Sequence, residues 1–91
     1  MDLQELRSRI DEVDNDLIRL VGQRMEISAE IAKYKQRHDL PVYDPVRERS
    51  KLDDLTGKVR EDHKPYISAL FTLLFELSRA EQEKVLDSEA H

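Results

Sequence analysis

The sequence predicts an all-α protein: a three-helix protomer with one very long N-terminal helix, paired with a second copy as an intertwined helical homodimer. Apolar residues recur at every third or fourth position from Leu3 to Tyr34, which is the spacing of the a and d positions of a coiled coil. Two later segments each begin near a proline and carry shorter apolar stripes at helical spacing. Only 38% of the 91 residues are hydrophobic, so one chain has a thin core that a partner chain is expected to complete.

The first predicted helix covers about residues 3–37. Asp2 is suited to cap its N-terminus, and Glu5, three residues later, can complete a capping box. Gly22 is the one glycine inside this segment and lowers helix propensity only modestly. At the rise of an α-helix this segment is about 50 Å long, which exceeds the core of a small domain. It therefore has to pack against something long, such as a second copy of itself.

Two shorter helices are predicted at about residues 45–60 and about residues 65–86. Asp44 followed by Pro45 is a typical helix start, with aspartate as the N-cap and proline at the first helical position. The tail, residues 87–91, is expected to fray.

Composition and charge exclude several classes of function. The chain is long enough for one domain, residues 1–91. Its net charge of −5 argues against nucleic acid as a partner. There is no cysteine, and the three histidines lack the spacing of metal ligands, so no metal is expected. No apolar run approaches the length of a membrane span and no signal peptide is recognisable, so we expect no membrane association and a cytoplasmic location.

One position of the apolar seam carries a charge. Between Leu20 and Ile27 the register falls on Arg24. A guanidinium within an apolar stripe is unfavourable unless an anion meets it, which favours an anion site. A polar seam residue can also serve to fix the register of a coiled coil, and the first helix alone supports both interpretations equally.

Two further cations lie beside this seam. Lys35 follows Arg24 by almost three whole turns, about 16 Å along the axis, so the two face the same way and their long side chains can converge on one small anion. Arg7 is about 25 Å from Arg24 on the same helix, too far to share that anion within one chain. In an antiparallel second copy it can meet the other chain's Arg24, which predicts a site composed from two chains. Taken singly, Arg7 and Lys35 are more typical of solvated charges.

Five more polar residues complete the candidate site, and each has an ordinary structural interpretation. Asp44 is suited to be a helix cap, Arg47 and Glu48 to be surface charges, and Ser78 and Gln82 to be satisfied polar groups that extend an aromatic stripe. Together with the three cations they form a set in which positive charges outnumber carboxylates, with no thiol nucleophile. Such a set suits a small dicarboxylate that is positioned and stabilised electrostatically and is not attacked covalently.

Four stretches, in this order, resemble the all-helical class of chorismate mutase, the intertwined-dimer type found alone or fused to other shikimate-pathway enzymes. They are LRSRIDEVDNDLIRLVGQRM (6–25), KYK (33–35), PVYDPVRER (41–49) and YISALF with ELSRAEQ (within 66–82). The resemblance implies an isomerase that rearranges chorismate to prephenate, at the entry to phenylalanine and tyrosine biosynthesis, without a cofactor or a metal. Catalysis would rest on selecting the reactive conformer and stabilising a polarised transition state.

The resemblance also implies a role for each candidate residue. Arg24 and the partner subunit's Arg7 would bind the two carboxylates of chorismate, with Arg47 and Ser78 assisting.

The remaining roles concern the ether oxygen and the ring hydroxyl. Lys35 and Gln82 would donate hydrogen bonds to the ether oxygen, where negative charge grows as the carbon–oxygen bond breaks. Glu48, with the backbone near Asp44, would hold the ring hydroxyl. Because Gln82 is neutral, no acid pH should be needed to keep a donor at this position.

The chain departs from the family pattern at three positions near the site. Tyr43 stands where enteric relatives carry a basic residue, and Phe75 and Arg79 stand where smaller aliphatic residues are common.

Two rival functions are kept. Isochorismate–pyruvate lyase shares the fold, the arginines and the lysine, while Asp44 with the VRER turn, Glu48 and Ser78 favours the mutase. A non-catalytic helical dimerisation or regulatory module predicts the seam, but gives no reason for Ser78 and Gln82 to align with the cations of the first helix.

Overall fold

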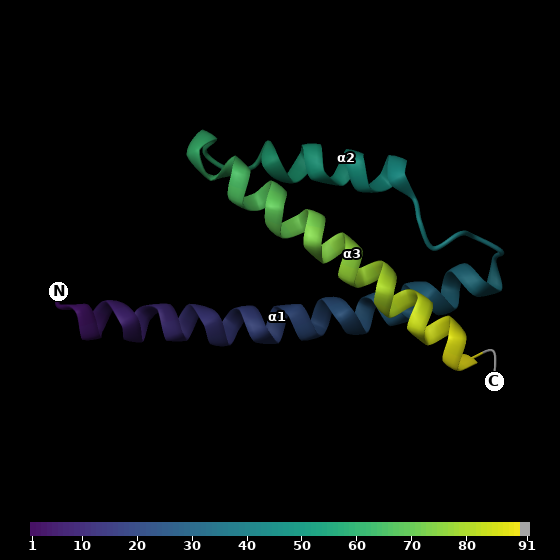
Figure 1. Ribbon diagram of the computed structural model, residues 1–91, viewed down its shortest axis with the longest axis horizontal. Helices are drawn as coiled ribbons and strands as arrows, with labels where there is room; N and C mark the ends of the chain where they lie inside the picture. Colours follow the sequence, from purple (N-terminus) through teal and green to yellow (C-terminus); the bar gives the residue numbers. More distant parts are fainter. Residues whose placement is uncertain (90–91) are drawn as a thin grey trace.

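The computed structural model describes residues 1–89 and consists of helices joined by short connectors (Figure 1). Helix α1 spans Leu3–Arg37, α2 spans Pro45–Thr56, the short 3-10 helix η1 spans Glu61–His63, and α3 spans Lys64–Glu89. Residues 1–89 contain no β-strand. The predicted all-α class with one very long N-terminal helix is confirmed. None of the helices in the described part of the chain is long and apolar enough to cross a membrane.

Both ends of α1 are closed by local hydrogen bonds. The Asp2 carboxylate accepts a hydrogen bond from the backbone N–H of Glu5 at 2.9 Å, which satisfies a free donor of the first turn. At the other end Asp39 adopts a left-handed conformation, with a φ of 54°. This allows the N–H of Leu40 to reach back to the carbonyl of Lys35 at 2.8 Å, the pattern that commonly ends a helix. The chain therefore leaves α1 sharply and turns towards α2.

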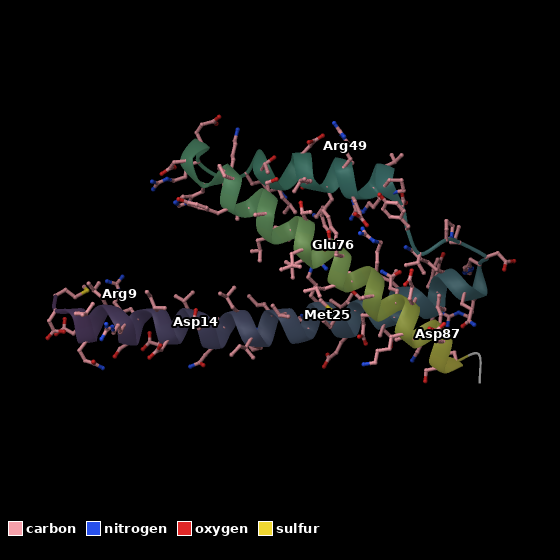
Figure 2. The ribbon with its side chains drawn as sticks, viewed as in Figure 1. Arg9, Asp14, Met25, Arg49, Glu76 and Asp87 are labelled. Atoms are coloured by element: carbon pink, nitrogen blue, oxygen red, sulfur yellow. The ribbon has the colours of Figure 1, made fainter. Side chains whose placement is uncertain are left out.

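The first half of α1 extends away from the rest of the chain. In Figure 1, α3 crosses only the C-terminal half of α1, and in Figure 2 Arg9 and Asp14 lie on the part of α1 that projects beyond it. The radius of gyration is 16.5 Å, against about 12 Å for a compact chain of this length. Seam residues are correspondingly open to solvent: Ile10 is 60% exposed and Leu17 is 48% exposed.

Little apolar surface is buried within one chain. The buried hydrophobic residues of the described region are Ala32, Leu74 and Phe75, and all three lie on α1 or α3. The core sits where these two helices cross, so the fold of the single chain depends on that crossing.

Helix α2 is shorter than predicted. The prediction placed its end near residue 60, but it ends at Thr56, with Gly57 as its C-cap. The Thr56 hydroxyl donates to the carbonyls of Leu52 and Asp53, at 3.0 and 3.3 Å. A side chain that bonds to the preceding turn competes with continued helix formation, and Gly57 has the lowest helix propensity of the non-proline residues.

Helix α3 is slightly longer than predicted at both ends. The expected range was 65–86, whereas α3 spans Lys64–Glu89 and follows directly on η1. Residues 87–89 of the tail expected to fray are thus helical. Residues 90–91 of that tail lie outside the described residues.

Candidate active site

A cavity of about 510 Å³ lies between the second half of α1, the start of α2 and the second half of α3. Its volume is within the range of small-molecule sites. Seven of the eight residues predicted for the site line it: Arg24, Lys35, Asp44, Arg47, Glu48, Ser78 and Gln82. The fold therefore brings together residues that are up to 58 positions apart, from Arg24 to Gln82.

Arg24 points from α1 towards α3. Its Nη1 donates a hydrogen bond to Ser78 Oγ, and its guanidinium lies 5.8 Å from the centre of the Phe75 ring. Partial burial lowers the pKa of Arg24 from its ordinary value; an arginine nevertheless stays protonated near neutral pH. The result is a desolvated positive charge at the wall of the cavity, where its attraction for an anion is stronger than at an exposed surface.

Ser28 is part of the same network, and sequence reasoning did not include it. It is 4% exposed, its hydroxyl donates to the Arg24 carbonyl at 3.0 Å, and its Oγ lies 2.9 Å from Ser78 Oγ. A hydroxyl has only one hydrogen to donate. Since that of Ser28 goes to the carbonyl, the hydrogen between the two serines comes from Ser78. One feature of the sequence could have indicated Ser28: it lies seven residues before Lys35, on the same face of the helix.

Lys35 is held at the cavity by the connector between α1 and α2. Its Nζ donates to the carbonyl of Val42 at 2.8 Å. An ammonium group has three hydrogens, so two remain for a ligand. This single contact both fixes the position of the charge and holds the connector against α1.

Gln82 is the buried amide of the site. It is 6% exposed, and its Oε1 is buried without a hydrogen-bond partner among the described residues. Leaving a buried polar atom unpaired costs about 1–3 kcal/mol. The amide can present either its oxygen or its NH₂ group after a half-turn of the terminal bond, so it is suited to bind a polar atom of a ligand in the cavity.

The α2 residues contribute one cap and one ion pair. Asp44 accepts a hydrogen bond from the backbone N–H of Arg47 at 3.0 Å, as its predicted role of N-cap requires, and still lines the cavity. Arg79 of α3 donates to both carboxylate oxygens of Glu48, and this contact raises the pKa of the Arg79 guanidinium. Arg79 also lies 4.7 Å from the centre of the Tyr43 ring. Sequence reasoning placed Arg79 at the rim of the site but did not find its pairing with Glu48.

Arg7 is the predicted residue that the single chain leaves outside the cavity. It is exposed on the projecting half of α1. Its predicted contribution is to the cavity of a second chain, and in one chain its side chain is exposed to solvent.

Positive charge dominates the cavity wall. Five cations and two carboxylates line it: Arg24, Lys35, Arg47, Lys51 and Arg79 against Asp44 and Glu48. A chain with a net charge of −5 thus carries a local excess of positive charge at a cavity lined by residues of all three helices. Such an arrangement attracts a small polyanion.

The fold and the cavity define an all-α protein with a cavity between its three helices that is lined mainly by cations. Residues 6–83 match the family described as chorismate mutase type II. The chain belongs to this family.

Three relatives illustrate the range of the family. The chain is 31% identical to a chorismate mutase of Methanocaldococcus jannaschii over 93% of this chain and 88% of that protein. It is 34% identical to a bifunctional chorismate mutase/prephenate dehydratase of Buchnera aphidicola, over 94% of this chain but 23% of that protein. It is 44% identical to a T-protein of Haemophilus influenzae over 55% of this chain, which spans 13% of that protein. The chain therefore corresponds to nearly all of one relative and to a small part of the two others.

The serine network predicts a test that is independent of any ligand. Ser28→Ala and Ser78→Ala should each lower the free energy of unfolding by about 1–2 kcal/mol, because each removes the bond between the two serines and one bond to Arg24. The double variant should lose clearly less than the sum of the two single losses, because the bond between the two serines is shared and can be lost only once. Urea unfolding at one fixed protein concentration measures this, with the exposed Ser8→Ala as a control near zero. Additive losses would contradict the network.

Proposed function

We propose that this protein is a chorismate mutase, an isomerase that rearranges chorismate to prephenate in aromatic amino acid biosynthesis. The observation that carries the proposal is the cavity between the three helices, in which an excess of cations surrounds one buried amide. Membership of the chorismate mutase type II family supports the same substrate.

The two carboxylates of the substrate are assigned to the arginines. Arg24, oriented by Ser78, binds one carboxylate, and the partner subunit's Arg7 binds the other, with Arg47 assisting from α2. A guanidinium presents two parallel N–H donors that match the two oxygens of a carboxylate. Holding both ends of the molecule selects the compact conformer in which the two reacting carbons are close.

The ether oxygen is assigned to Lys35 and Gln82. During the rearrangement one carbon–oxygen bond breaks as one carbon–carbon bond forms, and no proton moves. Negative charge builds on the ether oxygen, so donors placed there stabilise the transition state more than the ground state. Lys35 has hydrogens left for this purpose beside its bond to Val42, and Gln82 supplies a buried neutral donor once its NH₂ group faces the cavity.

The ring hydroxyl is assigned to Glu48, beside the Asp44 turn. No charge develops on the hydroxyl during the reaction. This contact therefore positions the substrate and stabilises the ground state and the transition state equally.

A homodimer completes each site. One chain leaves the seam of α1 exposed and its core thin, and pairing with a second long helix would bury this apolar surface.

The register of this pairing follows from the composite site. If the partner's Arg7 faces Arg24, a two-fold axis passes α1 near Asp16. This register sets Ile10 opposite the partner's Val21 and Val13 opposite the partner's Ile18. Ile18 lies outside the predicted seam, yet it is an apolar residue that is 71% exposed in one chain. This register explains why an apolar residue stands there, because the partner's Val13 covers it.

The first experiment is an assay of the purified protein on chorismate, with products separated by chromatography and isochorismate tested in parallel. Prephenate should form from chorismate, and Arg24→Leu should abolish its formation while the protein still dimerises. Pyruvate and salicylate from isochorismate, with little prephenate, would establish the lyase instead. No turnover of either compound by a folded dimer would leave a non-catalytic module.

Subunit mixing tests the contribution of Arg7 from the second chain. Arg7→Ala and Arg24→Ala should each be inactive alone. After unfolding and refolding together in equal amounts, half of the dimers are mixed, and each mixed dimer has one site with both arginines intact. The mixture should therefore regain about one quarter of the wild-type activity. Refolding each variant alone is the control. A mixture that stays inactive, with mixed dimers detected by mass, would refute the composite site.

The neutral amide predicts how activity responds to pH. Gln82→Glu should lower kcat/KM by about tenfold or more at pH 7.5, because a carboxylate there repels the charge that grows on the ether oxygen. Burial raises the pKa of a carboxyl group, so activity should recover as the pH falls towards 5 and the protonated acid becomes a donor. The wild type and the exposed control Gln36→Glu should show no such rise. An activity of Gln82→Glu that does not depend on pH would contradict the role of this residue.

A further inference from the structure

Glu48 and Arg79 form an ion pair in the cavity wall. The proposed chemistry gives a role to Glu48 but none to Arg79. Glu48 comes from α2 and Arg79 from α3, and both line the cavity. Arg79 Nη1 donates to both oxygens of the Glu48 carboxylate. The two side chains are 25% and 26% exposed, so they are partly shielded from water while remaining open to a ligand.

Arg79 is held from a second side by Tyr43. The guanidinium carbon lies 4.7 Å from the centre of the Tyr43 ring, within the range of a cation–π contact. Tyr43 belongs to the connector that Lys35 also fastens, through the neighbouring carbonyl of Val42. The orientation of Arg79 is therefore set by contacts to two other parts of the chain.

The pairing leaves Glu48 able to bind a hydroxyl. A carboxylate has about four positions at which it can accept a hydrogen, and Arg79 occupies two of them. An unpaired carboxylate in this cavity would also repel a dicarboxylate substrate. With Arg79 bound, the pair is neutral overall, and the carboxylate retains its negative oxygens for an O–H donor.

We infer that Arg79 is a positioning residue that holds Glu48 in place as the acceptor for the ring hydroxyl of the substrate. This inference rests on the proposed function. Arg79 acts through Glu48 and makes no bond to the substrate of its own. Its removal should therefore weaken substrate binding only as far as Glu48 depends on it.

Kinetics of a double-mutant cycle test this inference. Arg79→Met should raise KM for chorismate with kcat nearly unchanged, since the hydroxyl contact is made equally in the ground state and the transition state. The expected loss in kcat/KM is about 10- to 100-fold, the effect of a hydrogen bond to a charged group. In a Glu48→Gln background the same substitution should change kcat/KM by less than about twofold. Arg79→Lys, which keeps the positive charge but not the planar guanidinium, should restore part of the loss.

The control is Arg49→Met. Arg49 follows Glu48 on α2 and projects from its outer face, away from α3 (Figure 2), so this variant should keep the wild-type KM. Circular dichroism establishes that each variant is folded, and Arg79→Lys carries the test if Arg79→Met does not fold.

Three results would overturn the inference. They are a wild-type KM in Arg79→Met, a loss of thermal stability alone, and a loss of activity in the Glu48→Gln background as large as in the wild type. The last result would mean that Arg79 contacts the substrate directly. All three presuppose a wild-type enzyme that makes prephenate. A wild type without turnover would instead reject the proposed function, and this inference with it.

Discussion

The contact between Arg24 and Ser78 is the constraint on which the rest of the structure depends. It sits where α3 crosses α1, at the place where the apolar seam is interrupted by a charge. A guanidinium there has to meet oxygen atoms, and the two serine hydroxyls provide a relay from the guanidinium to the carbonyl of its own residue. The crossing is therefore specified by a polar network as well as by the small core of Ala32, Leu74 and Phe75. The same network orients Arg24 at the cavity, so the contact that fixes the helix crossing also positions a residue of the proposed anion site.

The sequence predicted well those features that depend on neighbours along the chain. The Asp2 and Asp44 caps, the proline start of α2 and the long apolar register of α1 are all local patterns, and each is present in the structure. The end of α2 was missed because Thr56 bonds back to its own helix, a choice of side-chain rotamer that spacing alone does not reveal.

The sequence predicted which residues line the cavity better than it predicted the hydrogen bonds and ion pairs between them. Spacing and resemblance identified seven residues that the cavity brings together, although they are distributed over three helices. The partners that orient them were not predicted, because Ser28 and Arg79 find theirs across the crossings between helices. A column of a helix indicates which residues face the same way, but the partner it faces is decided by the crossing angle and register of another helix.

The two carboxylates of the cavity are bound to partners other than Arg24 and Lys35. Asp44 is already bound to the N-terminus of α2, where the free N–H groups and the helix dipole favour a negative charge. Glu48 is already bound to Arg79. Neither carboxylate is therefore paired with Arg24, whose guanidinium bonds to a neutral hydroxyl, or with Lys35, whose ammonium bonds to a carbonyl. Neutral partners orient these two cations without cancelling their charge. The proposed dianionic substrate would then meet charges whose positions are already fixed, and such preorganisation suits the proposed rearrangement, which involves no proton transfer.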